Sequence, residues 1–105
     1  MERKKLSDGE IENSLLDLDE WEAENDNLKK HFEFETFAEA LAFVNKVGAI
    51  AEERDHHPDV LFGWGYAEFF LTTHDAGGIT QKDFELAKAI EAIESKSEKD
   101  AAEHK

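Results

Sequence analysis

The sequence predicts an α+β fold: a four-stranded antiparallel sheet with three helices packed on one face, in the order α-β-β-α-β-β-α. Three observations predict this class. Three segments have apolar residues at three- and four-residue steps, which is typical of amphipathic helices. Other segments alternate between apolar and polar residues or are rich in β-forming residues, as strands are. The two kinds of segment follow each other in an order that lets one helical layer cover one face of a sheet.

A chain of 105 residues has the length of one domain. We place this domain at residues 1–95. Residues 96–105 are charged and lack an apolar anchor, so we expect them to form a frayed C-terminal tail. In chain order, the expected elements are a helix, two strands, a helix, two strands and a helix, at residues 7–16, 21–24, 28–35, 37–54, 59–64, 67–73 and 80–94.

Each expected helix begins with the spacing of a capping box, in which a hydroxyl side chain and an acidic side chain three residues later each accept the other's backbone N–H. The pairs are Ser7 with Glu10, Thr36 with Glu39, and Thr80 with Asp83. The second helix must end by about Asp55, because Pro58 favours an extended backbone at the residue before it. The adjacent His56 and His57 therefore occupy a junction between helix and strand.

The strand over residues 28–35 alternates cleanly between apolar and polar side chains. Only Lys30 interrupts its apolar face. His31 lies on the polar face, where we interpret it as a solvated residue without a functional role.

The next two strands should form a hairpin, because Gly65-Tyr66 is a Gly-X pair suited to a two-residue type II′ turn. This turn predicts a positive φ at Gly65 and places His57 opposite His74. Directly opposed residues have Cβ atoms about 4.5–5.5 Å apart and point to the same side of the sheet. The two imidazoles would then contact one small ligand, with His56 at the rim.

The hairpin carries more large apolar side chains than one helical layer covers. One face has Val60, Phe62, Trp64, Phe69 and Leu71, and the other has Leu61 and Phe70. We expect the excess to be buried between subunits of a homodimer or homotetramer.

Composition excludes several classes of function. The chain has no cysteine, so disulfides, thiolate metal sites and cysteine nucleophiles are absent. A formal net charge of −14 argues against direct nucleic-acid binding, which uses clustered Lys and Arg, and indicates a solvated acidic surface. The N-terminus lacks an apolar signal region, and no run approaches the roughly 18 apolar residues of a membrane span. We expect a cytoplasmic protein without a membrane partner.

Three of the five histidines stand in one stretch of the sequence. Histidine transfers protons near neutral pH, so such a group indicates acid–base chemistry or a metal site. The spacing of seven residues here strongly resembles that of the pterin-4a-carbinolamine dehydratases. The residues are Glu52, His56-His57-Pro58, Trp64, His74 and Asp83. The flanking segments at residues 37–44 and 76–83 are similar to the family's as well.

The resemblance implies a lyase that removes water from 4a-hydroxytetrahydropterin to give quinonoid dihydropterin, in tetrahydrobiopterin recycling, with no cofactor and no metal. It implies the same α+β fold. We assign His57 and His74 to the acid–base pair and His56 to holding or polarising the pterin, although the sequence does not fix which histidine has which role. The residues expected to bind substrate are Glu52, Asp55, Pro58, Thr72, Thr73 and Asp75. Of these, Glu52 or Asp55 would orient a histidine ring or raise its basicity.

Other interpretations remain open for several of these residues. Three histidines can hold zinc, although an adjacent pair before a proline is an awkward arrangement for shared ligation. The adjacent pair and His74 are also compatible with ordinary helix and strand ends. Asp83 is better explained by helix capping than by catalysis, and Trp64 and Tyr66 by core or interface packing than by pterin stacking.

Two functions of other classes also remain. Animal members of the family stabilise dimers of a transcription factor as non-enzymatic partners. A pterin-binding relative acting in another pathway, such as molybdopterin metabolism, would share the same residues.

Overall fold

The computed structural model describes the backbone of residues 4–103 and the side chains of residues 4–94. Its elements follow the predicted order α-β-β-α-β-β-α, with a short 3₁₀ helix, η1, added before the last helix. They are α1 (Asp8–Leu15), β1 (Glu22–Glu24), β2 (Asn27–Glu33), α2 (Phe37–Arg54), β3 (Asp59–Gly63), β4 (Tyr66–Leu71), η1 (His74–Ala76) and α3 (Gln81–Glu103).

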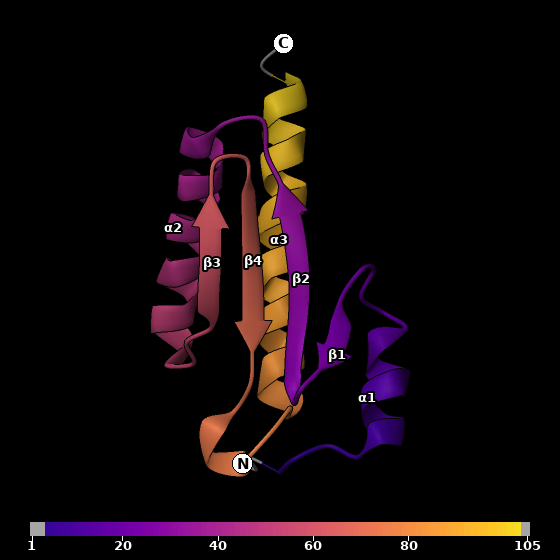
Figure 1. Ribbon diagram of the computed structural model, residues 1–105. Helices are drawn as coiled ribbons and strands as arrows, with labels where there is room; N and C mark the ends of the chain where they lie inside the picture. Colours follow the sequence, from indigo (N-terminus) through magenta and orange to yellow (C-terminus); the bar gives the residue numbers. More distant parts are fainter. Residues whose placement is uncertain (1–3, 104–105) are drawn as a thin grey trace.

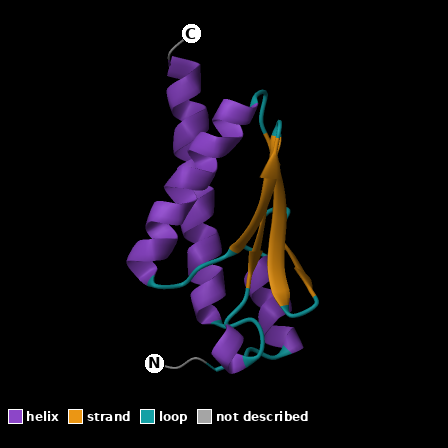
Figure 2. Ribbon diagram, turned by 60° about the vertical axis from the view of Figure 1, so that its left-hand side comes forward, coloured by secondary structure: helices purple, strands orange, loops and turns teal. Residues whose placement is uncertain are grey.

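The four strands form one antiparallel sheet in the order β1-β2-β4-β3, so the hairpin strand β4 lies in the middle, beside β2 (Figure 1). Seen from the side, the helices α2 and α3 lie together on one face of this sheet (Figure 2). The side chains buried between these layers are mostly apolar and come from β2, β4, α2 and α3. They include Leu28, Phe32, Phe69, Leu71, Phe43, Val47, Phe84 and Ile90. The predicted α+β class is confirmed.

The helix starts follow the predicted capping residues. In α1 the box is complete, since Ser7 Oγ accepts the Glu10 N–H at 3.1 Å and Glu10 Oε1 accepts the Ser7 N–H at 2.8 Å. This bond to the Ser7 backbone lowers the pKa of Glu10 below its usual value. In α2, Thr36 caps the Glu39 N–H, but the Glu39 carboxylate accepts from the Glu35 N–H instead of from Thr36. The second box is therefore only half formed.

The predicted hairpin register is wrong. The two turn residues are Trp64 and Gly65, because Gly63 pairs with Tyr66 and Phe62 with Ala67. Gly65 has the predicted positive φ, 84°, but at the second central position, as in a type II turn. This register places the Tyr66 ring over Gly63. The ring covers Gly63 so closely that a Cβ there would lie 2.9 Å from Tyr66 Cε1.

As a result, the ladder does not bring His57 opposite His74. The last pair at the open end of the hairpin joins Asp59 to Phe70, and β4 ends at Leu71. Both histidines lie beyond the paired strands, so their approach depends on the connecting loops.

Replacing Gly65 by valine is expected to lower the free energy of unfolding by about 2 kcal/mol, because a β-branched residue is strained at positive φ. The new Cβ would also lie 3.2 Å from the Phe34 carbonyl oxygen. Urea denaturation measures the stability change. The control is Gly48→Ala in the middle of α2, where a Cβ meets nothing within 4 Å. That change should stabilise by about 0.5–1 kcal/mol, and equal effects in the two variants would contradict the strain argument.

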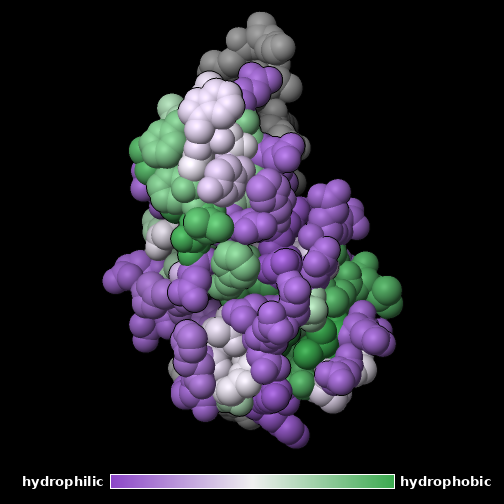
Figure 3. Space-filling view, viewed as in Figure 1, coloured by the Kyte–Doolittle hydropathy of each residue, from purple (hydrophilic) through white to green (hydrophobic). Residues whose placement is uncertain are grey.

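Large apolar side chains remain exposed along the edge strand β3 and the neighbouring part of α2. Their exposed fractions reach 53% at Leu61 and 74% at Trp64, with Phe37, Leu41 and Val60 also exposed. Hydrophobic surface gathers over this side of the hairpin in the space-filling view (Figure 3). The single chain therefore leaves exposed part of the apolar excess that the sequence indicated.

Among the described residues, no helix is long and apolar enough to cross a membrane. Helix α3 continues to Glu103. The expectation of a frayed tail at 96–105 stays untested, because side chains past Glu94 and the last two residues lie outside the described part of the chain.

Candidate active site

The end of α2 positions the adjacent histidines. Asp55 has left-handed backbone angles, φ 53° and ψ 43°, and its N–H still bonds to the carbonyls of Ala51 and Glu52. The His56 N–H bonds to the Ala51 carbonyl as well, at 3.1 Å. Aspartate tolerates this conformation better than most residues, which suits it to ending a helix sharply. The turn sends His56 and His57 out of the helix at the point where Pro58 requires an extended chain.

His56 is the most buried of the three histidines, with a side chain 11% exposed. Its Nε2 lies 2.6 Å from Oδ1 of Asp83, a carboxylate on the first turn of α3 that is wholly buried. The expectation that His56 lies at the rim is therefore wrong. The buried carboxylate holds the ring on the inner side of the site.

His57 has a different environment. Its Nε2 lies 2.8 Å from Oε1 of Glu52, and both side chains are largely exposed, at 56% and 81%. Glu52 reaches back to His57 because the left-handed residue at the end of α2 reverses the chain between them. This contact agrees with the expectation that Glu52 orients a histidine ring. An exposed pair of this kind contributes little to stability.

His74 stands on η1, in a loop that closes on itself after β4. The Thr73 N–H bonds to the Gly78 carbonyl at 3.0 Å, and the Thr73 carbonyl accepts from Ala76 and Gly77. Within residues 4–94, the His74 ring has no hydrogen-bonding or ion-pair partner. Its exposed imidazole is therefore available to a ligand.

These segments enclose one shallow pocket of about 280 Å³. All three histidines line it, together with four of the residues expected to bind substrate: Asp55, Thr72, Thr73 and Asp75. Glu52 reaches the site through His57, and Pro58 is half-buried in the connection behind it. The hairpin argument predicted one common site for the histidines. The structure places them there through loops instead of through the strand register.

Two threonines of the pocket already use their hydroxyl groups in the fold. Thr72 Oγ1 donates to the Asp26 carbonyl at 2.7 Å, which ties the pocket to the turn between β1 and β2. Thr73 is buried, and its Oγ1 donates to Asp83 Oδ2 at 2.9 Å. Each oxygen can still accept a hydrogen bond.

Sequence reasoning missed one part of this arrangement. It explained Asp83 as a helix-capping residue, and that is confirmed, since Oδ2 accepts the Thr80 N–H at 2.9 Å. The same carboxylate also binds His56 and Thr73. The position of Asp83 in the motif was the available signal, because capping alone does not require a fixed spacing from the histidines.

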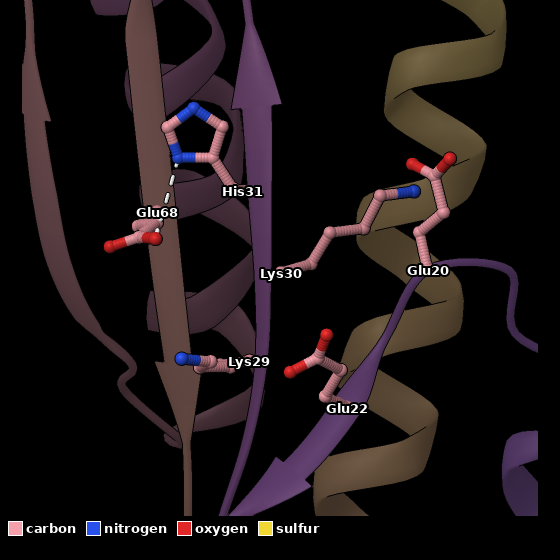
Figure 4. Close-up of a pocket in the computed structure, with 6 residues that line it drawn as sticks. All are labelled: Glu20, Glu22, Lys29, Lys30, His31 and Glu68. Atoms are coloured by element: carbon pink, nitrogen blue, oxygen red, sulfur yellow. Dashed lines mark ion pairs between the residues drawn. The ribbon is translucent and has the colours of Figure 1, made fainter.

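A larger hollow of about 400 Å³ lies over β1 and β2, away from these histidines. Figure 4 shows His31 leaning over β4 toward Glu68 while Lys30 extends from β2 toward Glu20. The pKa of Lys29 in this hollow is raised by its hydrogen bond to Glu24 and by the charge of that carboxylate. Most charges here are paired within the fold, so the hollow offers no comparable set of groups for proton transfer.

Among the described residues, no three His, Asp or Glu side chains are grouped so that they could hold a metal ion. Asp83 and Glu52 each face a histidine Nε2 at hydrogen-bond distance. This is the arrangement by which proteins orient an imidazole for proton transfer.

The fold and this pocket define an α+β protein whose site is built from three histidines, two of them held by carboxylates. The chain belongs to the pterin 4 alpha carbinolamine dehydratase family, whose model matches residues 4–93. This confirms the resemblance seen in the sequence.

Relatives in other organisms match nearly the whole domain. The chain is 46% identical over 90 residues to a protein of Sulfolobus acidocaldarius, covering 86% of this chain and 99% of that protein. It is 47% identical over 89 residues to a protein of Roseiflexus sp., covering 85% and 96%. Both carry the name "Putative pterin-4-alpha-carbinolamine dehydratase".

Two solved structures are similar. A transcriptional coactivator/pterin dehydratase from Brucella melitensis superposes with a TM-score of 0.82 at 28% identity, covering 86% of this chain and 98% of that one. A pterin dehydratase-like protein, identified as a RuBisCO assembly factor in the alpha-carboxysome, has a TM-score of 0.57 at 26% identity, with coverage of 70% and 84%.

Proposed function

We propose that the protein dehydrates a 4a-hydroxytetrahydropterin to the quinonoid dihydropterin, with His56, His57 and His74 as the groups that contact the substrate. The observation that carries the proposal is the convergence of all three rings on one pocket, two of them held by carboxylates. Family membership supports the same reaction. We place the reaction in the cytoplasm, in tetrahydrobiopterin recycling.

The reaction needs two proton movements. The C4a–O bond breaks with its electron pair on oxygen, and a proton delivered to that oxygen lets it leave as water. A ring nitrogen of the pterin loses its proton, and the electron pair of that N–H bond forms the new C=N bond. A positioned imidazole accelerates each transfer by about 10²–10⁴-fold.

His57 and His74 are suited to these transfers because both rings are exposed in the pocket. Glu52 orients the His57 ring through its contact with Nε2 at 2.8 Å. His56, which is more buried, holds or polarises the pterin, and Asp55, Pro58, Thr72, Thr73 and Asp75 complete the binding surface. No metal or cofactor takes part in this scheme.

The test is an assay of synthetic 4a-hydroxytetrahydropterin, followed by the absorbance of the quinonoid product. We expect the purified chain to accelerate dehydration, with the same rate after treatment with a chelator. A rate no faster than that of buffer would refute the proposal. Loss of activity on chelation would favour the zinc alternative.

A second candidate is a non-enzymatic binding role. Two structural relatives favour it, since one is described as a transcriptional coactivator as well as a pterin dehydratase, and the other as a RuBisCO assembly factor. A pterin-binding role in another pathway, such as molybdopterin metabolism, is the third. If the chain binds the pterin but does not dehydrate it, the third candidate would be favoured. If it captures a protein partner and does not bind pterin, the second would be favoured.

We also propose that the chain forms a homodimer or homotetramer through the exposed apolar side chains of β3 and its surroundings, without a membrane or nucleic-acid partner. Light scattering at micromolar concentration should give a multiple of the 12.0 kDa chain mass. Leu61→Asp, which puts a charge in the exposed apolar surface, should shift the mass toward the monomer. The matched control is Glu68→Asp on the paired strand. A stable wild-type monomer would refute the oligomer.

A further inference from the structure

Asp83 is the most connected buried polar group of the site. It has no exposed surface, and three donors surround its carboxylate. The contacts are His56 Nε2 at 2.6 Å on Oδ1, and Thr73 Oγ1 and the Thr80 N–H, each at 2.9 Å, on Oδ2. The proposed reaction does not bring this carboxylate to the substrate, because Asp83 does not line the pocket.

The hydrogen bonds around Asp83 have a consistent direction. The Thr73 hydroxyl has one proton and gives it to Asp83, so the Thr80 hydroxyl must donate in the bond that joins the two threonines at 2.8 Å. Thr80 Oγ1 in turn accepts from the Lys82 N–H at 3.2 Å. Each donor in this chain points toward Asp83, which suits an ionised carboxylate that can only accept.

An ionised Asp83 fixes the proton on His56. A carboxylate without a proton can bind Nε2 only if that nitrogen carries the hydrogen. In the neutral ring, Nδ1 is then the unprotonated nitrogen and the one left for a ligand. The opposite tautomer would present an N–H to the ligand and leave two acceptors facing each other at 2.6 Å.

The same carboxylate holds the loop that carries His74. Thr73 immediately precedes His74, and its backbone closes the loop through Gly78. Because the Thr73 side chain is bound to Asp83, the loop is fixed to the first turn of α3 at the position that also holds His56. One buried group therefore sets the positions of two histidines at the open end of the hairpin, one before β3 and one after β4.

We propose that Asp83 is the positioning residue of this site: it holds His56 with the proton on Nε2 and fixes the His74 loop against α3. The proposal rests on the proposed function for its effect on rate. Its effect on the tautomer can be measured without any turnover.

The first experiment is ¹⁵N NMR of the wild-type chain labelled at histidine, since ring shifts distinguish protonated from unprotonated nitrogens. The His56 signals are assigned by their loss in His56→Asn. We expect a proton on His56 Nε2 in the folded chain, whether or not Nδ1 also carries one. An unprotonated Nε2 in the folded chain would overturn the proposal. This outcome is independent of whether the protein dehydrates pterins.

The second experiment uses Asp83→Asn. The amide oxygen can still accept from Thr73 and Thr80, but the NH₂ group now faces His56 and reverses the tautomer. We expect the proton to move to Nδ1 and kcat to fall about 100-fold, with KM changed less than about threefold. Glu85→Gln, on the exposed side of the same helix, should change neither the spectrum nor kcat.

Thr73→Val separates the two roles proposed for Asp83, holding His56 and fixing the His74 loop. It also provides a test if Asp83→Asn does not fold. It removes the loop contact but leaves the bond between His56 and Asp83. We expect kcat to fall about tenfold or more while the His56 signals keep the proton on Nε2. Unchanged kcat in Thr73→Val, or an unchanged tautomer in folded Asp83→Asn, would refute the corresponding part of the proposal. If wild type shows the expected tautomer but no dehydratase activity, the proposed function fails and the positioning of His56 stands.

Discussion

His74→Ala is expected to lower kcat for pterin dehydration by about 10²–10⁴-fold, the usual contribution of one positioned acid or base. The fold should not change, because the ring is exposed on η1 and has no hydrogen-bonding partner within residues 4–94. His57→Ala should lower kcat by a similar factor. Its fold should not change either, since that ring is also more than half exposed. Steady-state kinetics measure the loss, and the urea midpoint verifies the fold.

The matched control for both variants is His31→Ala. This histidine is 44% exposed and contacts Glu68 at 3.4 Å on the other face of the sheet. We expect it to keep wild-type kcat. Full activity in both His57→Ala and His74→Ala would rule out the assignment of the acid–base pair. A similar loss in His31→Ala would mean that the effect is not specific to the pocket.

Glu91→Ala is expected to lower the free energy of unfolding by about 3 kcal/mol, the lower end of the range for breaking a buried ion pair. Glu91 Oε2 binds the Lys30 ammonium at 2.6 Å and the Trp21 indole N–H at 2.7 Å. Lys30 is only 8% exposed and would keep a buried charge without its partner. The effect should stay below the top of the range, because Glu91 is 27% exposed and water can reach the gap.

Urea denaturation measures this change, with Lys88→Ala on the exposed side of α3 as the control, expected within about 0.5 kcal/mol of wild type. The double variant Lys30→Met with Glu91→Leu should recover most of the loss, because apolar side chains of similar size replace both charges. If Glu91→Ala were as stable as wild type, the buried pair would have no net role in stability.

Much of the fold could be predicted from short-range patterns. The capping residues Ser7 and Thr36 start their helices as predicted, and α2 has the predicted bounds, Phe37–Arg54. These features depend on neighbours three or four positions away, which a sequence displays directly. The hairpin turn lies one residue earlier than predicted. A Gly-X pair and an X-Gly pair overlap at Gly65, and the local sequence does not distinguish between them; in the observed register Tyr66 pairs with Gly63 and packs over it.

The site was predictable in its residues but not in its connections. Family spacing indicated the histidines, and the structure brings all three to one pocket. The link from His56 to Asp83 depends on how α2 and α3 dock. His56 and Asp83 are 27 positions apart in the sequence, so no local pattern shows that they are in contact. Lys30 was noticed only as a break in an apolar face. Its partner Glu91 lies 61 positions further along the chain, where no local pattern connects the two.

The contact between His56 and Asp83 also has a consequence for the order of folding. The β3–β4 hairpin lies between these two residues and closes over a two-residue turn, so it can form early from local contacts. The contact itself can form only after α3 has docked against α2, because the intervening chain must first be brought into a closed loop. The pocket is therefore complete only when α3 has docked against α2, because His56 follows the end of α2 and Asp83 lies on the first turn of α3.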